Sequence, residues 1–262
     1  MPGCQLNIDQ RGVGTIMLDR PEQHNAFDDS LIAELIQRLA DLAADETVRI
    51  VVLRARGKSF SAGADLNWMR RMADYDEAQN LADAMQLAEL MRSLNALPKP
   101  TIARVQGAAF GGGVGLIACC DIALASAHAL FSLSEVKLGL IPAVISPYVV
   151  KAIGERAARR YMLSAERFDA QQAARLGLVH EIVDHDELDI RLDDMITTLL
   201  ESGPAAQAAA KDLILDIAGK PVDPSLIENT ARRIAKVRAS DEAREGLNAF
   251  LQKRKPGWVK RD

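Results

Sequence analysis

The sequence predicts an α/β fold that continues into a helical C-terminal region. Strand-like and helix-like segments alternate between residues 13 and 125, a pattern typical of α/β cores. Hydrophobic residues make up 48% of the chain, which is enough for a large core. We therefore expect a core over residues 1–200 and a helical region over residues 201–262. From Ala143 onward the pattern is almost purely helical, with breaks near Gly154, Ser164, Gly177, Gly203 and Gly219.

The first predicted elements are two strands and the helix between them. Val13–Leu18 is a short β-rich run that a turn follows. Ser30 can cap a helix that continues to about Asp41, because leucines then recur on one helical face. Ile50–Leu53 is an uninterrupted apolar run, which is typical of a strand buried on both faces.

The next predicted elements alternate with glycine-containing loops. A loop over Arg56–Ala64 precedes a long helix, roughly Asp76–Leu97, which two prolines end. Thr101–Val105 is another strand, and Gly111–Gly113 opens a further helix. Asp121–Ala125 has the pattern of a strand again. Both glycine-containing loops therefore follow a buried strand.

Charge and cysteine content exclude several classes of protein. The net charge is −4, from 32 basic and 36 acidic residues, which predicts no nucleic-acid surface. No apolar run approaches the roughly 20 residues of a membrane helix, and the N-terminus lacks the pattern of a signal peptide. Cys4, Cys119 and Cys120 are an odd number without metal or redox spacing, so we expect buried, reduced thiols. Reduced thiols indicate a cytoplasmic protein.

Two of the loops could hold one oxygen atom between their backbone amides. Loop one, Phe60–Leu66, and loop two, Gln106–Gly115, both lead from a strand into a helix and consist largely of small residues. The amide of Ala64 would lie at the partly positive end of a helix, and no side chain covers the amides of the three glycines in loop two. Two N–H donors aimed at one oxygen are the geometry of an oxyanion hole.

Each loop alone also allows a simpler interpretation. Glycines permit close packing between a strand and a helix, and a single glycine-rich turn indicates such packing as readily as a site. A phosphate-binding loop fits less well. No Lys-Ser/Thr pair follows Gly111–Gly115, and Leu116 stands where a dinucleotide-binding motif has its last glycine.

Glu135 is the third candidate feature. It lies in Phe131–Pro142, a largely apolar stretch, and burial of a charge requires a partner or a shift of pKa. A glutamate whose pKa rises toward neutrality is a competent general acid and base. The alternative is an ion pair with a neighbour such as Lys137.

Together these segments resemble the enoyl-CoA hydratase/isomerase (crotonase) superfamily along nearly the whole chain. The resemblance implies a spiral of ββα units with a helical C-terminal region, assembled as trimers or as pairs of trimers. It also implies an acyl-coenzyme A thioester as the substrate. The five motifs that carry it are Asp19-Arg20-Pro21 with Asn25-Ala26, Phe60–Leu66, Gln106–Gly113 with Cys120–Ala123, Ser134-Glu135 with Gly139–Pro142, and Phe250 with Lys253–Pro256.

The resemblance assigns roles to individual residues. The amides of Ala64 and Gly112 would bind the thioester oxygen, and Glu135 would be the acid or base. Phe250 and Lys253 would reach the adenine end of the ligand, in some members from a neighbouring subunit. Coenzyme A is part of the substrate, so neither a separate cofactor nor a metal is expected. The segments that contact coenzyme A would include Glu22, His24, Ala26, Ala62, Asp65 and Leu66. The acyl pocket would be lined by Trp68, Met69 and Met72, for which ordinary helix packing is the alternative.

Gly115 departs from the pattern of the family. Typical hydratases carry two glutamates; Glu135 matches the second, whereas the first would fall at Gly115. A single acid is commoner in members that shift double bonds. Three segments, Phe60–Met69, Gly107–Asp121 and Ala143–Pro147, nevertheless resemble the methylglutaconyl-CoA hydratase group of leucine and acyclic terpenoid breakdown. We expect Gly115 to enlarge the acyl pocket for a branched, optionally carboxylated acyl group, whose charge Arg70 or Arg71 could meet.

Three functions remain open at this point. The first is a hydratase of a branched 2-enoyl-CoA, the second is an enoyl-CoA isomerase, and the third is a catalytically silent acyl-CoA-binding or assembly subunit. Retention of Glu135 and of both loops disfavours the silent subunit. The four histidines have no metal-ligand spacing, and the absence of a Gly-x-Ser-x-Gly motif disfavours a serine nucleophile.

Overall fold

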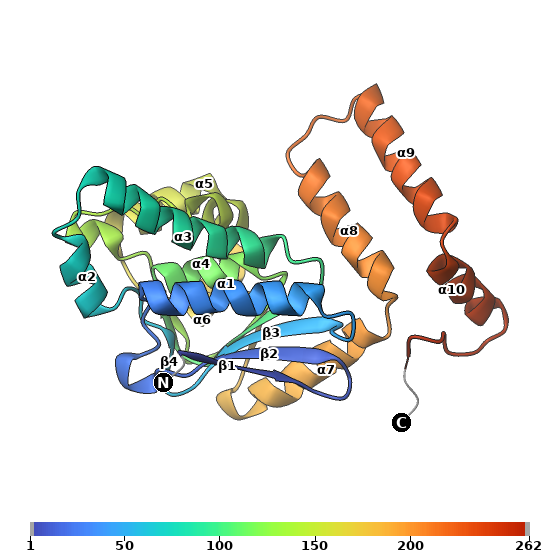
Figure 1. Cartoon of the computed structure of the whole chain (residues 1–262), viewed down its shortest axis with the longest axis horizontal. Coiled ribbons are helices and arrows are strands. Elements are labelled where there is room, and N and C mark those ends of the chain that lie inside the picture. The colour runs from blue at the N-terminus through green and yellow to red at the C-terminus, as the bar shows by residue number, and fades with distance from the viewer. Residues whose placement is uncertain (1–2, 260–262) are drawn as a thin grey trace.

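The computed structural model describes residues 3–259, whose strands form two sheets (Figure 1). The larger sheet has six strands in the order β1-β2-β3-β5-β7-β10. β1 is antiparallel to β2, and the other neighbours are parallel. The predicted strands at residues 13–18, 50–53, 101–105 and 121–125 are thereby confirmed, to within two residues at their ends. The strands are β1 Cys4–Ile8, β2 Val13–Leu18, β3 Ile50–Ala55, β5 Thr101–Val105, β7 Ile122–Ser126 and β10 Glu181–Val183.

The larger sheet separates two apolar clusters because its central strands are buried on both faces. Successive side chains of a strand point to opposite faces. In β3, Val51 and Leu53 therefore join the main core, whereas Ile50 and Val52 join a second cluster with α7, Leu188–Leu200. Figure 1 shows α1 and α3 on one side of this sheet and α7 on the other. The helices of the main core include α1 Asp29–Ala44, α3 Glu77–Asn95 and α4 Gly112–Cys119.

The smaller sheet places the two glycine-containing loops next to each other. Its order is β4-β6-β8-β9, and β4 and β6 are parallel neighbours. β4 ends at Ser61, where loop one begins, and β6 ends at Phe110, directly before Gly111. Because the carboxyl ends of parallel neighbours lie at the same edge, loops one and two leave the sheet side by side. These short strands were not predicted. They are β4 Ser59–Ser61, β6 Ala108–Phe110, β8 Leu130–Ser132 and β9 Phe168–Asp169.

Aspartates cap the first three α-helices. α1 begins after Asp28, whose side chain accepts a hydrogen bond in the first turn, so the predicted cap at Ser30 is wrong by two residues. A short helix, α2 Leu66–Met72, begins after Asp65. The long predicted helix is α3, and Asp76 caps it in a capping box with Gln79.

The second half of the chain is mainly helical, as predicted. The predicted break at Gly154 is a kink, with φ 76° in the middle of a helix. α7 ends at Leu200, so the predicted division at residue 200 falls between α7 and α8. Figure 1 shows α8–α10 extending away from the body of the molecule. The further helices are α5 Ser146–Ser164, α6 Ala170–Leu176, α8 Pro204–Ile217, α9 Pro224–Arg238 and α10 Asp241–Leu251. Three short 3₁₀ helices are η1 Pro21–Gln23, η2 Glu135–Leu138 and η3 His185–Glu187.

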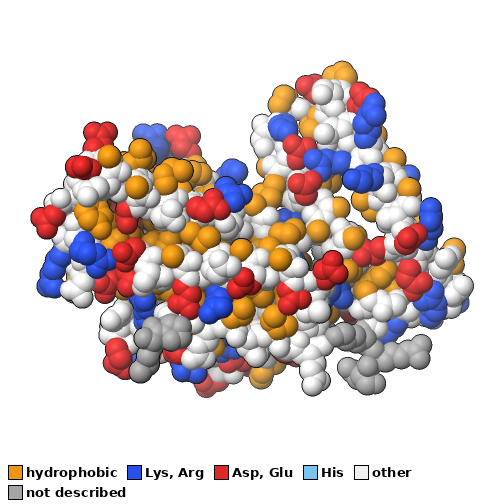
Figure 2. All heavy atoms as spheres, in the orientation of Figure 1, with side chains coloured by type: hydrophobic (Ala, Val, Ile, Leu, Met, Phe, Trp, Pro, Cys, Tyr) orange, Lys and Arg blue, Asp and Glu red, His pale blue; other side chains and the backbone are white. Residues whose placement is uncertain are grey.

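The extended helices expose apolar side chains. We call α8–α10 the C-terminal arm. Hydrophobic atoms are visible over this arm and along the body beside it (Figure 2). Phe250 is 81% exposed, which is far more than a single chain normally leaves of a phenylalanine. The other exposed apolar residues of the arm include Ile214, Leu215, Ile227, Ile234, Leu247 and Leu251.

The three cysteines are free and buried, as predicted. Burial raises the pKa of Cys4 and of Cys120 to about 12, so both thiols are protonated at neutral pH. Within residues 3–259, no helix is both long enough and apolar enough to cross a membrane.

Candidate active site

Loop one is held in place by Phe27. The amide of Phe27 donates to the carbonyl of Gly63 at 2.7 Å, and the amide of Asp65 donates to the carbonyl of Phe27 at 2.7 Å. This is a parallel bridge between Phe27 and Ala64, in which the residues flanking Ala64 make the hydrogen bonds. The N–H of Ala64 therefore points away from Phe27, and in the described chain it has no acceptor.

Loop two ends in the first turn of α4. Gly111 precedes the helix with φ 51° and ψ −118°, a conformation that only glycine adopts at low cost. Its amide donates to the carbonyl of Ser132 at 3.0 Å, which fixes the loop on β8. Gly112 is the first residue of the helix, so its N–H has no partner within the helix and lies at the partly positive end.

Glu135 brings a carboxylate to the junction of the two loops. A methyl group on Gly111 would lie 3.0 Å from Oε1 of Glu135 and 4.0 Å from the Cα of Gly63. Gly111 is therefore between the carboxylate and loop one. The three features predicted from separate segments, the two loops and the acid, converge on this point.

Glu135 has the environment of a general acid and base. Its Oε2 is buried and has no hydrogen-bond partner among residues 3–259. Burial raises the pKa of the Glu135 carboxyl above its ordinary value, although a hydrogen bond to its own backbone amide opposes the shift. Lys137 is exposed, and the structure shows no ion pair between it and Glu135. The alternative of a charge-paired, structural glutamate is thereby disfavoured.

The segment that precedes Phe27 lies alongside loop one. The amide of Ala62 donates to the carbonyl of His24 at 3.0 Å, and Nδ1 of His24 lies 3.1 Å from Oγ of Ser59. Glu22, His24 and Leu66 are exposed, whereas the side chain of Ala26 is buried. The structure thus joins two of the predicted coenzyme A residues, His24 and Ala62, through their backbones, and Ala26 is buried between them in the chain and not exposed to a ligand.

A sequence model described as enoyl-CoA hydratase/isomerase matches residues 9–261, which is nearly the whole chain. The chain belongs to the enoyl-CoA hydratase/isomerase family. The predicted superfamily is therefore confirmed.

Related proteins of known structure support the same fold. An enoyl-CoA hydratase from Shewanella pealeana is 52% identical, with a TM-score of 0.95 over 98% of this chain and 96% of that chain. AtuE of Pseudomonas aeruginosa is 37% identical, with a TM-score of 0.94 over 98% of this chain and 100% of that chain.

Sequence comparison alone finds similar relatives. One of them, a 2,3-dehydroadipyl-CoA hydratase from Escherichia coli, is 32% identical over 95% of this chain and 96% of its own length.

Trp68 packs within the core, as the alternative of ordinary helix packing predicts. Its role in lining an acyl pocket stays a prediction. Trp68 is 5% exposed, and its indole Nε1 donates to Oδ1 of Asp83 at 3.1 Å, which joins α2 to α3. Met69 and Met72 are half-buried on the same helix. The carboxylate of Asp65 accepts hydrogen bonds from two amides of the first turn of α2, so it is occupied as a helix cap.

The two arginines that follow loop one differ in their partners. Arg71 forms an ion pair with Asp29 at 2.7 Å. Arg70 donates to the side-chain oxygen of Asn67 at 2.9 Å, and no carboxylate of the described chain pairs with it. Arg70 is therefore the better candidate of the two for a carboxylate on the substrate.

The predicted open space at Gly115 is wrong. A methyl group on Gly115 would lie 2.3 Å from Cγ2 and 2.9 Å from Cβ of Ile145, and 3.3 Å from Cε of Met91. Both neighbours are buried, so the volume that a larger residue would occupy is filled by apolar side chains. Gly115 is hence covered by Ile145 and does not open the pocket.

Phe250 and Lys253 do not approach the loops within one chain. They lie at the end of α10 and just after it, and Figure 1 shows α10 on the side of the molecule opposite α2, the helix that follows loop one. Both side chains are exposed. The single chain therefore does not bring α10 beside α2, the helix that follows loop one.

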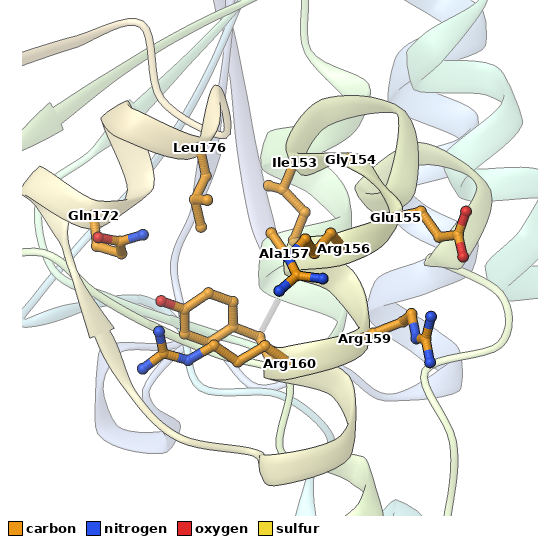
Figure 3. A pocket seen from close by; sticks show the side chains of 10 residues that line it. Ile153, Gly154, Glu155, Arg156, Ala157, Arg159, Arg160, Gln172 and Leu176 are labelled. Carbon is orange, nitrogen blue, oxygen red and sulfur yellow. The ribbon is translucent and has the colours of Figure 1, made fainter.

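A hollow of the described chain lies elsewhere, between α5 and α6 (Figure 3). It measures about 750 Å³ and is lined by residues near the kink at Gly154, including Arg156 and Gln172. None of the residues predicted for the site lines it. In the described ranges, no three His, Cys, Asp or Glu side chains are grouped as metal ligands would be.

Phe27 and Ile145 belong to the site but were not predicted. Phe27 immediately follows a motif of the family, so its place beside loop one could have been inferred from that spacing. Ile145 lies in Ala143–Pro147, a segment that carries the resemblance to the methylglutaconyl-CoA group. Its contact with Gly115 could not be inferred, because an isoleucine before a helix is indistinguishable from an ordinary core residue.

Proposed function

We propose that this protein hydrates a 2-enoyl-CoA, with Glu135 as acid and base and the amides of Ala64 and Gly112 as the oxyanion hole. The supporting observation is the position of the Glu135 carboxylate against Gly111, where the two loops meet. The amides of Ala64 and Gly112 lie on these loops and have no hydrogen-bond acceptor in the described chain. A thioester whose carbonyl oxygen lies between the amides would present its α- and β-carbons to Glu135.

The proposed reaction uses one carboxylate twice. The oxygen of a water molecule bonds to the β-carbon while Glu135 accepts a proton from that water, and the electrons of the double bond shift to give an enolate. The negative charge on the thioester oxygen is stabilised by the two amides, at about 3–4 kcal/mol for each donor. Protonated Glu135 then returns its proton to the α-carbon and the carbonyl re-forms, so that one water has been added.

The raised pKa of Glu135 suits both steps. A base must be ionised to accept the proton of water, and an acid must hold that proton until the α-carbon takes it. Burial disfavours the ionised form, which makes Glu135 a stronger base than an exposed glutamate. The same carboxyl can therefore serve as acceptor and as donor near neutral pH.

We propose further that the acyl group carries a carboxylate, as in methylglutaconyl-CoA. Arg70 supports this, because its charge is unpaired in the described chain and it lies one turn into the helix that follows loop one. The relative that is named a 2,3-dehydroadipyl-CoA hydratase has a dicarboxylic acyl group in its name. A methyl branch draws no support from Gly115, because Ile145 fills that space.

Isomerisation is the second candidate. The family description includes isomerases, and Ile145 and Met91 leave no room for a second acid at Gly115. An isomerase needs only one carboxylate to take a proton from one carbon and return it to another. Hydration differs because it requires a bound water, and the mass of the product separates the two reactions.

A mass-spectrometric screen tests the proposed function. Crotonyl-CoA, methylglutaconyl-CoA and 2,3-dehydroadipyl-CoA would each be incubated with the protein, with Arg70→Gln as a variant and Arg71→Gln as its control. We expect a product heavier by one water and the highest kcat/KM for a carboxylated thioester, a preference that Arg70→Gln lowers. Unchanged mass with a shifted double bond would establish the isomerase, and unchanged thioester would leave only a binding subunit.

We also propose that the chain assembles as a trimer or hexamer. The exposed apolar side chains of α8–α10 require a cover, and another copy of the chain is the proposed one. Phe250 and Lys253 would then reach the adenine end of coenzyme A in a neighbouring subunit, because α10 lies on the opposite side of its own chain from α2, the helix that follows loop one.

A further inference from the structure

We propose that Ile145 is the residue that limits the size of the acyl group at its β-carbon. The proposal rests on the proposed function only in taking an acyl-CoA as the ligand. It follows from the contacts of Gly111, the residue before α4 that Glu135 approaches, and of Gly115 within α4.

Glu135 and Ile145 contact two positions that are four residues apart. The amide of Gly115 donates to the carbonyl of Gly111 at 3.2 Å, so the residue before α4 and Gly115 within it are separated by about one helical turn. A side chain on Gly111 would meet the carboxylate of Glu135, and a side chain on Gly115 would meet Ile145. The isoleucine therefore lies about one turn of α4 beyond the position that the carboxylate contacts.

A bound acyl group would extend from the first contact toward the second. With its carbonyl oxygen between the amides of Ala64 and Gly112, the α-carbon lies beside Glu135 and the β-carbon one bond further on. Substituents on the β-carbon that turn toward α4 then meet the side chain of Ile145. Its branch at Cβ, which includes Cγ2, is the part that covers Gly115.

Ile145 cannot readily move aside. It is 2% exposed, and its carbonyl accepts hydrogen bonds from the amides of Tyr148 and Val149 at 3.1 and 3.0 Å, which fix it at the start of α5. Met91, which is fully buried, closes the space from α3. Both residues are apolar, so this wall selects by shape and not by charge.

The test compares the affinities for two saturated thioesters that the enzyme cannot turn over. Isothermal titration calorimetry would measure Kd for butyryl-CoA and for the bulkier 3,3-dimethylbutyryl-CoA with the wild type and with Ile145→Ala. The wild type should bind the bulky thioester more weakly. In Ile145→Ala the ratio of the two Kd values should shift toward the bulky ligand by about tenfold or more, because each methylene in such a pocket changes discrimination by at least that factor.

Ile196→Ala is the matched control. Ile196 is 4% exposed and lies on α7, in the second apolar cluster, so its truncation removes the same atoms on the other face of the sheet. The ratio of the two Kd values in Ile196→Ala should equal the ratio in the wild type. If Ile145→Ala does not fold, Ile145→Leu keeps the side-chain volume but lacks the branch over Gly115, and it should shift the ratio in the same direction by a smaller factor.

The outcomes separate this proposal from the proposed function. An unchanged ratio in Ile145→Ala or Ile145→Leu, in a protein whose wild type hydrates enoyl-CoA, would overturn the role of Ile145 alone. An equal shift in Ile196→Ala would overturn it as well, because the effect would then be a general consequence of loosening the core. A wild type that binds neither thioester would overturn both.

Discussion

The carboxylate of Glu135 lies against the backbone of Gly111, so close that a methyl group at Gly111 would be 3.0 Å from Oε1. Two features of glycine are therefore needed at this position. Its φ of 51° allows loop two to turn into α4, and its missing side chain lets the acid approach. This contact joins the proposed acid to the loop that supplies one of the proposed oxyanion donors.

The stability of the folded protein should depend on pH through Glu135. Because burial raises the pKa of Glu135 in the folded state, the folded protein binds more protons than the unfolded chain between the two pKa values. The contribution of Glu135 to the free energy of unfolding is therefore present below the ordinary pKa of glutamate, about 4.3. It is lost as the pH rises through the raised pKa of Glu135 in the folded protein.

Glu135→Gln removes this dependence, so its free energy of unfolding should exceed that of the wild type at neutral pH and approach it in acid. Urea unfolding across this pH range measures the difference. Glu155→Gln, an exposed glutamate on α5, serves as the control and should show no such trend. A constant difference between Glu135→Gln and the wild type would show that Glu135 does not titrate differently in the folded state.

Proline at Gly112 should remove one oxyanion donor. Gly112 is the first residue of α4, a position where proline is tolerated because the missing N–H has no helical partner. Any side chain there would lie 3.2 Å from the ring of Phe27, so Gly112→Ala is the matched control that keeps the amide.

We expect kcat of Gly112→Pro to be about 10²–10³-fold below that of Gly112→Ala, with little difference in the affinity for coenzyme A. Circular dichroism would establish that both variants fold. Equal kcat in the two folded variants would exclude the Gly112 amide from the oxyanion hole.

A side chain at Gly115 should destabilise the protein and not reshape an empty pocket. Gly115→Ala forces its methyl group to within 2.3 Å of Cγ2 of Ile145, and such overpacking costs about 1–3 kcal/mol of unfolding free energy. In the background of Ile145→Ala the same substitution should cost less, with a coupling of about 0.5–3 kcal/mol in a double-mutant cycle. Denaturant unfolding of the four proteins provides these values. Additive costs would mean that the two residues do not share this space.

The assembly should depend on Phe250. Light scattering should give three or six times the chain mass of 28.5 kDa for the wild type, and a smaller species for Phe250→Asp. Leu163→Asp, which changes a similarly exposed apolar residue on α5, should leave the mass unchanged.

If Phe250 covers the adenine ring, Phe250→Ala should weaken binding of coenzyme A by about tenfold, as for base stacking elsewhere. A wild-type monomer with normal turnover would contradict both expectations.

The long elements of the fold could be predicted because their patterns are local. β3 begins with the uninterrupted apolar run Ile50–Leu53, and the helical periodicity before Leu97 marks α3. β1 was missed although Cys4–Ile8 alternates apolar and polar residues, which is the pattern of a half-buried strand. Strands of two or three residues such as β9 are too short for any periodicity. The cap of α1 was placed at Ser30 because Asp28 and Ser30 are both good capping residues, and only the structure distinguishes them.

The site was predictable to the extent that its residues lie on glycine-rich loops or stand out as a buried acid. Ala64, Gly112 and Glu135 carry such signals. The contact between Gly115 and Ile145 does not, because it joins residues that are distant in the sequence and depends on how α4 and α5 pack. A missing side chain indicates open space only if no neighbour fills it, and here Ile145 does.

The turnover of Glu135→Gln tests the central claim most directly. The rate of mass gain by one water would be measured for the best enoyl-CoA substrate, with wild type, Glu135→Gln and the Glu155→Gln control. If Glu135 is the acid and base, kcat should fall by about 10²–10⁴-fold in Glu135→Gln alone, while the Kd of the saturated thioester changes little. A folded Glu135→Gln variant that adds water at the wild-type rate would contradict the claim.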